Sequence, residues 1–173
     1  MQFNLDQSIE ILGQTPLVLK NLLIGLSEEW IQNNEGAETW SPYNIVGHLI
    51  HGEKTDWIPR AVIILSPNAD KSFEPFDRFA QFRESEGKTL KQLLDEFKIL
   101  RKQNIQHLRS MEITEADLEK VGKHPAFGAV TLKQLIATWM VHDLNHISQI
   151  CQVMAKQYKD EVGPWSAYLG ILK

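Results

Sequence analysis

Two histidines, His142 and His146, lie four residues apart in the stretch MVHDLNH, which apolar residues flank on both sides. Positions four apart in a helix project from the same face. Two imidazoles at this spacing can bind one divalent metal ion. A buried polar group without a partner destabilises a fold. The pair therefore indicates either histidines that are hydrogen-bonded within a core or histidines that share a metal ion.

A third ligand is the next requirement, because catalytic zinc sites usually have three protein ligands and keep one position open for water. Four further histidines are present. His48, in IVGHLIHGE, is expected on the apolar face of a helix. His51 is expected nearer the flank of that helix, His107 at the polar edge of another, and His124 in a loop before a proline. Helical geometry therefore favours His48 as the third ligand.

The elements that position these histidines are predicted from helical periodicity and capping signals. Ser41–Pro42 and the two TLKQ stretches, which begin at Thr89 and Thr131, are typical helix starts. Pro59 predicts a bend in the second segment, and Pro16 predicts a kink or restart in the first. The four expected helical segments are 5–30, 41–65, 89–108 and 131–156.

Four long amphipathic segments with little strand signal predict an all-α fold, a four-helix bundle that forms a single domain over residues 1–173. The connection 66–88, between the second and third helices, is long for such a bundle and is expected to be a crossover or a lid. The stretch GKHPAFG at 122–128 is expected to be a loop, and GPWSAYLGIL near the end is expected to add a short packed helix.

The composition is that of an ordinary globular protein, with 43% hydrophobic and 23% charged residues. The net charge of -4 argues against nucleic-acid binding. Basic residues of the third helix, Arg101 among them, are interrupted by Asp95 and Glu96, so a solvated face is expected. A single cysteine, Cys151, fits a reducing cytoplasm. With no signal-peptide pattern and no long apolar run, we expect a cytoplasmic protein without membrane contact.

Two stretches together resemble the DinB-like family of four-helix-bundle proteins. TWSPYNIVGHL resembles the start of that family's second bundle helix, where a Trp-Ser pair precedes a histidine. FGAVTLKQLIATWMVHDLNHISQI resembles its last bundle helix, with a polar cap, an H-x-x-x-H pair and a glutamine a few residues later. The likeness extends over nearly the whole chain in length and helix order.

The resemblance implies a three-histidine metal site inside the bundle, with His48, His142 and His146 as the ligands and zinc or nickel as the typical ion. It also implies a metal-dependent enzyme that transfers a low-molecular-weight thiol to a small electrophilic substrate. Two alternatives stay open: a non-catalytic metal-binding stress-response protein, and a metal-dependent hydrolase of small molecules. Dimers are common among such proteins, so a homodimer is one expected assembly.

Other polar residues are candidates for supporting roles around the ligands. Asp143 follows His142 where zinc proteases of the H-E-x-x-H type have a glutamate base. It is one methylene shorter, and we expect it to support a ligand or face solvent. Glu53 and Asp56 are further candidates for such support, and Gln149 is a candidate for orienting a ligand or for capping a neighbouring helix. Aromatic residues expected either in a pocket wall or in the core are Trp40, Trp57, Trp139 and Phe127.

Overall fold

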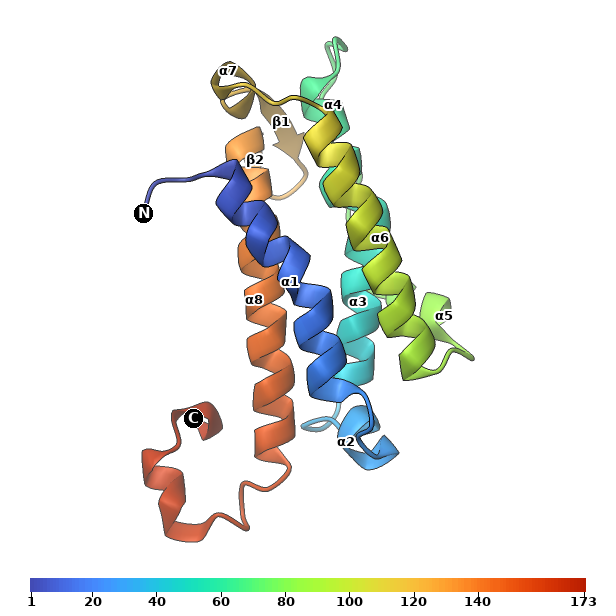
Figure 1. The fold of residues 1–173 in the computed structure, drawn as a ribbon, viewed down its shortest axis with the longest axis vertical. Coiled ribbons are helices and arrows are strands. Elements are labelled where there is room, and N and C mark those ends of the chain that lie inside the picture. Colours follow the sequence, from blue (N-terminus) through green and yellow to red (C-terminus); the bar gives the residue numbers. More distant parts are fainter.

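The computed structural model describes residues 1–173, most of which are helical (Figure 1). A two-stranded antiparallel hairpin, β1 (Val121–His124) and β2 (Gly128–Thr131), precedes the last helix. Two 3-10 helices, η1 (Gly163–Tyr168) and η2 (Gly170–Leu172), follow it. The α-helices are α1 (Leu5–Leu23), α2 (Glu28–Gln32), α3 (Pro42–Thr55), α4 (Trp57–Leu65), α5 (Ala80–Ser85), α6 (Leu90–Ser110), α7 (Glu115–Leu118) and α8 (Leu132–Lys156).

Four rods form the predicted bundle: α1, the consecutive pair α3 and α4, α6, and α8. Both α1 and α3 pack on α6 and α8, so α1 lies diagonally opposite the α3–α4 rod. Figure 1 shows that the α3–α4 rod and α6 run in one direction, whereas α1 and α8 run in the other. The connection 66–88 must therefore return along the length of the bundle, which makes it a crossover.

The helix starts follow the capping signals. Ser41, Thr89 and Thr131 each accept a hydrogen bond from the backbone N–H three residues later, and each of these caps forms a complete capping box. A capping box satisfies two backbone N–H groups that have no partner inside the helix. The predicted starts of α3, α6 and α8 are therefore confirmed. Helix α8 also ends at Lys156, as predicted.

Two of the expected segments are divided. The first ends before Gly25, whose φ of +85° lies in the left-handed region, and a separate short helix follows; Pro16 stays inside α1 without interrupting it. The second segment breaks directly after Thr55 rather than at Pro59. Proline lacks an N–H, and its ring crowds the carbonyl four residues earlier. Pro59 therefore interrupts the helical hydrogen bonding at Thr55.

The prediction of a loop at 122–128 was wrong, because this stretch contributes to both strands of the hairpin. Strands of four residues with glycines show too little alternation to be recognised. The hairpin also holds the crossover, since the backbone of Lys123 bonds to Lys71 and Phe73 at 2.9 and 3.0 Å. Gly122 allows this close approach: a Cβ there would lie 2.5 Å from the Phe73 ring.

The crossover is tied to α3 at its other end, around α5. The Tyr43 hydroxyl donates to the backbone oxygens of Ser85 and Lys88 at 2.6 and 2.7 Å. Glu84 contacts Nδ1 of His51 at 3.0 Å and Nζ of Lys54 at 3.2 Å. These contacts hold α5 against the face of α3 that carries His48.

The bundle has two hydrophobic clusters rather than one continuous core. The first joins the start of α1, α4, the end of α6 and the start of α8, and it includes Leu12, Ile64, Leu108 and Trp139. The second joins the end of α1, α3, the first half of α6 and the end of α8, and it includes Leu19, Leu49, Phe97 and Ile150. Buried polar side chains lie between the two clusters, halfway along the rods, and they are His48, Glu53, Arg101, Asp143 and His146.

The chain after α8 leaves the bundle and curls back beside the end of that helix (Figure 1). Two 3-10 helices occupy the place where one short packed helix was expected. Only Leu172 of these is buried, whereas Trp165 and Tyr168 are 69% and 88% exposed. None of the helices combines the length and apolar character needed to cross a membrane.

Candidate metal centre

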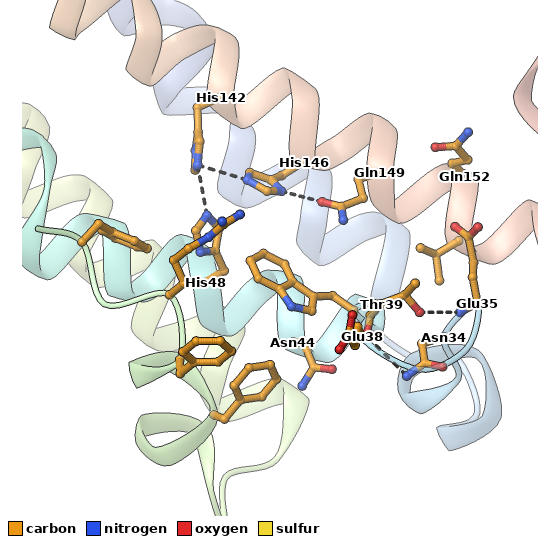
Figure 2. Close-up of a pocket in the computed structure, with 16 residues that line it drawn as sticks. Asn34, Glu35, Glu38, Thr39, Asn44, His48, His142, His146, Gln149 and Gln152 are labelled. Atoms are coloured by element: carbon orange, nitrogen blue, oxygen red, sulfur yellow. Dashed lines mark hydrogen bonds between the residues drawn. The ribbon is translucent and has the colours of Figure 1, made fainter. Parts of the chain in front are cut away.

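His48 on α3 and His142 and His146 on α8 direct their rings toward a common point (Figure 2). Nε2 of His142 lies 3.1 Å from Nε2 of His48 and 3.0 Å from Nε2 of His146. One ligand atom from each of the three residues lies within 4.8 Å of the other two. The structure therefore brings together, from two rods, the three histidines that the sequence singled out.

Two glutamines fix the orientation of the rings. Oε1 of Gln81, on α5, lies 3.0 Å from Nδ1 of His48, and Oε1 of Gln149 lies 2.8 Å from Nδ1 of His146. Because an amide oxygen only accepts, each Nδ1 carries the proton and each Nε2 presents its lone pair to the common point. Metal-binding histidines typically have such a partner on the second ring nitrogen.

The three rings are uncharged at neutral pH. Burial, together with the neighbouring His146, lowers the pKa of His48 to about 4, and burial with the same neighbour lowers the pKa of His142 to about 3. Burial also lowers the pKa of His146, although its bond to Gln149 opposes the shift. Neutral imidazole is the form that binds a metal ion, so no proton has to be displaced first.

The residues present fit a divalent cation. Nε2 of His48 and Nε2 of His146 both present lone pairs to Nε2 of His142. A neutral His142 ring carries only one proton, so it cannot provide a hydrogen-bond donor for both of them. Nδ1 of His142 is itself buried without a hydrogen-bond partner. Tetrahedral zinc–imidazole bonds would separate ligand nitrogens by roughly 3.3 Å. The Nε2 separations of 3.0–3.1 Å are close to this value.

A buried ionic cluster lies beside the histidines. Arg101 donates to both oxygens of Asp143 and, at 2.8 Å, to Oε1 of Glu53. Glu53 also accepts from Nε1 of Trp139 at 3.0 Å and from Nδ2 of Asn104 at 2.9 Å. Both carboxylates are thereby paired, and neither is free to act as a base.

The expectations for these polar residues are corrected in part. Arg101 was expected on a solvated face, but it is 1% exposed, because its position faces the bundle while its basic neighbours do not. Asp143 is buried in the ionic cluster rather than bonded to a ligand ring. Asp56 pairs with Arg60 instead of approaching His48. Gln149 bonds to Nδ1 of His146, which is the contact that the expected orienting role requires.

The other histidines lie outside the triad. His51 is buried rather than at the flank, and it bonds to Glu84. His107 is exposed on α6, as expected. His124 ends β1, where its Nδ1 accepts hydrogen bonds from the backbone of Ala126 and Phe127.

A cavity of about 1090 Å³ opens onto the three histidines (Figure 2). Trp40 lines it as expected, with its ring centroid 4.9 Å from that of His48. Trp57 and Trp139 are core residues, although Trp57 contacts the edge of His142. Phe127 is 78% exposed in the hairpin turn and does not line the cavity.

Sequence reasoning missed the contribution of the crossover to this cavity. Its residues there are Phe76, Arg78, Phe79 and Phe82, and Gln81 binds His48 from the same segment. The stretch FDRFAQF at 76–82 supplies all of these residues. The repeated aromatic residues with a single arginine were the one available signal.

Comparison with known proteins gives three findings. Residues 12–150 match the family model described as the DinB superfamily. A Bacillus subtilis protein, described as uncharacterized protein YuaE, is 26% identical over 164 residues, which cover 86% of this chain and 98% of YuaE. A solved structure, described as "YfiT from Bacillus subtilis is a probable metal-dependent hydrolase with an unusual four-helix bundle topology", is similar with a TM-score of 0.75. It is 18% identical, and the match covers 88% of this chain and 87% of YfiT.

Proposed function

This chain belongs to the DinB superfamily, and on that premise we propose that it is a metal-dependent enzyme that acts on a small molecule. His48, His142 and His146 hold the divalent ion, zinc or nickel. The observation that carries this proposal is the convergence of three neutral imidazoles. Nε2 of His142 lies 3.1 Å from Nε2 of His48 and 3.0 Å from Nε2 of His146. A bound ion would supply Lewis acidity and a lowered pKa for a coordinated water or thiol.

The open cavity favours catalysis over a purely structural ion. Structural zinc sites are closed by four protein ligands, whereas catalytic sites keep a position free. Here three protein ligands face a space of about 1090 Å³, large enough for a small-molecule substrate. A non-catalytic metal-binding role remains the alternative that an activity assay decides.

Transfer of a low-molecular-weight thiol is the reaction that the charges around the site favour. Asp143 and Glu53 are both held in ion pairs with Arg101, and Figure 2 shows Glu35 and Glu38 away from the histidines, at the other side of the cavity. No carboxylate is therefore placed to deprotonate a nucleophile. A thiol depends less on such a base than water does, because a thiol that coordinates a metal ion loses its proton outright. Gln81 and Gln149 keep the ligand rings in place during this step.

Hydrolysis is the second candidate, because the structural neighbour YfiT is described as a probable metal-dependent hydrolase. The chain and YfiT share their fold at 18% identity. A hydrolase with this site would use water in place of the thiol as the nucleophile.

The experiment begins with elemental analysis of protein purified without chelator, followed by assays of the zinc- and nickel-loaded protein. One assay conjugates a panel of thiols with electrophiles such as monobromobimane and 1-chloro-2,4-dinitrobenzene, and the other hydrolyses small esters and amides. We expect thiol conjugation that His142→Ala abolishes and that His107→Ala, on the exposed face of α6, leaves unchanged. A protein that binds neither ion contradicts the metal centre. A loaded protein inactive in both assays supports the non-catalytic alternative.

A further inference from the structure

Arg78 is a cation without a protein partner in the wall of the candidate site. It lines the cavity, and it forms neither an ion pair nor a side-chain hydrogen bond. Two acidic residues of the crossover, Asp77 and Glu84, are already paired with other groups. Asp77 binds Arg83 at 2.7 Å, and Glu84 binds His51 and Lys54 at 3.0 and 3.2 Å. Arg78 is thus the one basic group of this segment that faces the cavity with its donors free.

Aromatic side chains line the same cavity as this arginine. Phe79 and Phe82 line the cavity, and they are 69% and 40% exposed. Trp40 and Phe76 line it as well, and both contact His48. Exposed apolar surface that borders a polar group in a concave site is typical of a ligand-binding site.

We propose that Arg78 binds the carboxylate of a small organic acid whose apolar body packs against Phe79, Phe82 and Trp40, beside the histidine triad. This inference rests on the proposed function for the reaction at the triad, and it adds the chemical class of the substrate. The planar guanidinium presents paired N–H donors that match the two oxygens of a carboxylate.

The charges of the cavity favour a carboxylate over a phosphate. Phosphate groups carry up to two negative charges and are usually held by several cations or backbone N–H groups. Here one arginine faces the ligand, and Glu35 and Glu38 line the other side of the same cavity. A ligand with one negative charge near Arg78 and an uncharged apolar body matches this distribution of charges in the cavity.

The test compares two probes of nearly the same shape, 4-phenylbutyrate, which is a carboxylate, and its uncharged amide, 4-phenylbutanamide. Their binding is measured by the fluorescence of the tryptophans or by calorimetry, in metal-free and metal-loaded protein. A charge-assisted, bidentate hydrogen bond should make the acid bind about tenfold more tightly than the amide. Arg78→Gln should remove this preference, and Arg78→Lys should retain part of it.

Arg83→Gln is the matched control, because Arg83 lies on the same segment but pairs with Asp77 outside the cavity wall. It should leave the preference for the acid unchanged. Equal binding of acid and amide, no binding of either at millimolar concentration, or a preference that survives in Arg78→Gln would each overturn the proposal. Metal content is measured separately, so a protein that binds no metal refutes the proposed reaction, while the metal-free binding data still decide the role of Arg78.

Discussion

Arg101 and Asp143 form a buried bidentate ion pair between α6 and α8, in which Nη1 and Nη2 each donate to one carboxylate oxygen. The arginine is 1% exposed and the aspartate is fully buried. The same guanidinium also donates to Glu53 on α3 and to the backbone oxygen of Leu12 on α1, each at 2.8 Å. One side chain therefore bonds to all three of the other rods, at the level of the histidines.

Replacement of this arginine should strongly destabilise the fold. Arg101→Met leaves the carboxylates of Glu53 and Asp143 buried without their cation, and breaking a buried pair in this way costs about 3–5 kcal/mol. Chemical denaturation measures the free energy of unfolding. Lys102→Met, at the exposed neighbouring position, should change it by less than about 0.5 kcal/mol. A loss of under about 1 kcal/mol for Arg101→Met would contradict the role of the cluster.

Metal loading should raise the melting temperature. An ion that binds only the folded protein adds about 2.7 kcal/mol of stability at a free concentration one hundred times its dissociation constant. Thermal unfolding with and without zinc or nickel measures the effect, and chelator should reverse it. His48→Ala and His146→Ala should abolish the shift, whereas His107→Ala should keep it. A melting temperature that neither ion changes would exclude the site.

The glutamine partners of the ligand rings should affect metal affinity more than stability. Gln149→Leu removes the acceptor for Nδ1 of His146, and loss of such a partner typically weakens metal binding about 10- to 100-fold. Competition with a chromogenic chelator measures the affinity. Gln152→Leu is the matched control, because this residue lines the same cavity but contacts no ligand ring. Equal affinities for the two variants would show that Gln149 does not support the site.

The metal-free protein should lose stability on acidification. The pKa values of His48 and His142 are about 4 and about 3 in the folded state, below the ordinary 6.5. Between pH 4 and pH 6.5, the unfolded chain therefore binds more protons at these two histidines than the folded protein does. The free energy of unfolding is highest above pH 6.5 and falls as the pH drops toward 4, by at most about 1.4 kcal/mol per pH unit for each histidine. Denaturation between pH 5 and 7 measures the slope, which His142→Leu should reduce; an equal slope in that variant would contradict the assignment.

The close contact between the hairpin and the crossover should not tolerate a methyl group. In Gly122→Ala the new Cβ would lie 2.5 Å from the Phe73 ring and 2.8 Å from Ile64, so we expect a loss of about 1–3 kcal/mol from overpacking. Gly13→Ala is the control, because its Cβ meets nothing within 4 Å inside α1. That control should be neutral or stabilising by up to about 1 kcal/mol. Chemical denaturation of both variants compares them, and equal stability would contradict the close packing.

Local patterns were sufficient to predict the rods and the pairing of two histidines on one face of α8. The helix starts at Ser41, Thr89 and Thr131 depend on contacts within one turn, so they can be predicted from a single sequence. His142 and His146 share a helix face by their spacing alone. The addition of His48 relied on its apolar neighbours and on a family resemblance, and the structure places all three rings together.

Contacts between distant segments could not be predicted in the same way. Gln81 reaches His48 across 33 positions, from a crossover whose path depends on the hairpin and on Tyr43. The burial of Arg101 depends on which helices flank α6. The interruption at Gly25 and the close approach of β1 to the crossover at Gly122 each depend on a single glycine. A glycine in a sequence indicates a turn or a close approach, but it does not show which distant segment lies nearby.

The ionic cluster has an electrostatic consequence for whatever the triad holds. Glu53 and Asp143 with Arg101 sum to one formal negative charge in the bundle interior, and the charge of Asp143 extends to the imidazole of His146. Neutral ligands alone would leave a dication with its full charge in a medium of low polarity. The cluster would therefore act as a counterion for a dication at the triad without occupying a coordination position, and the site would keep a net positive charge toward an incoming molecule.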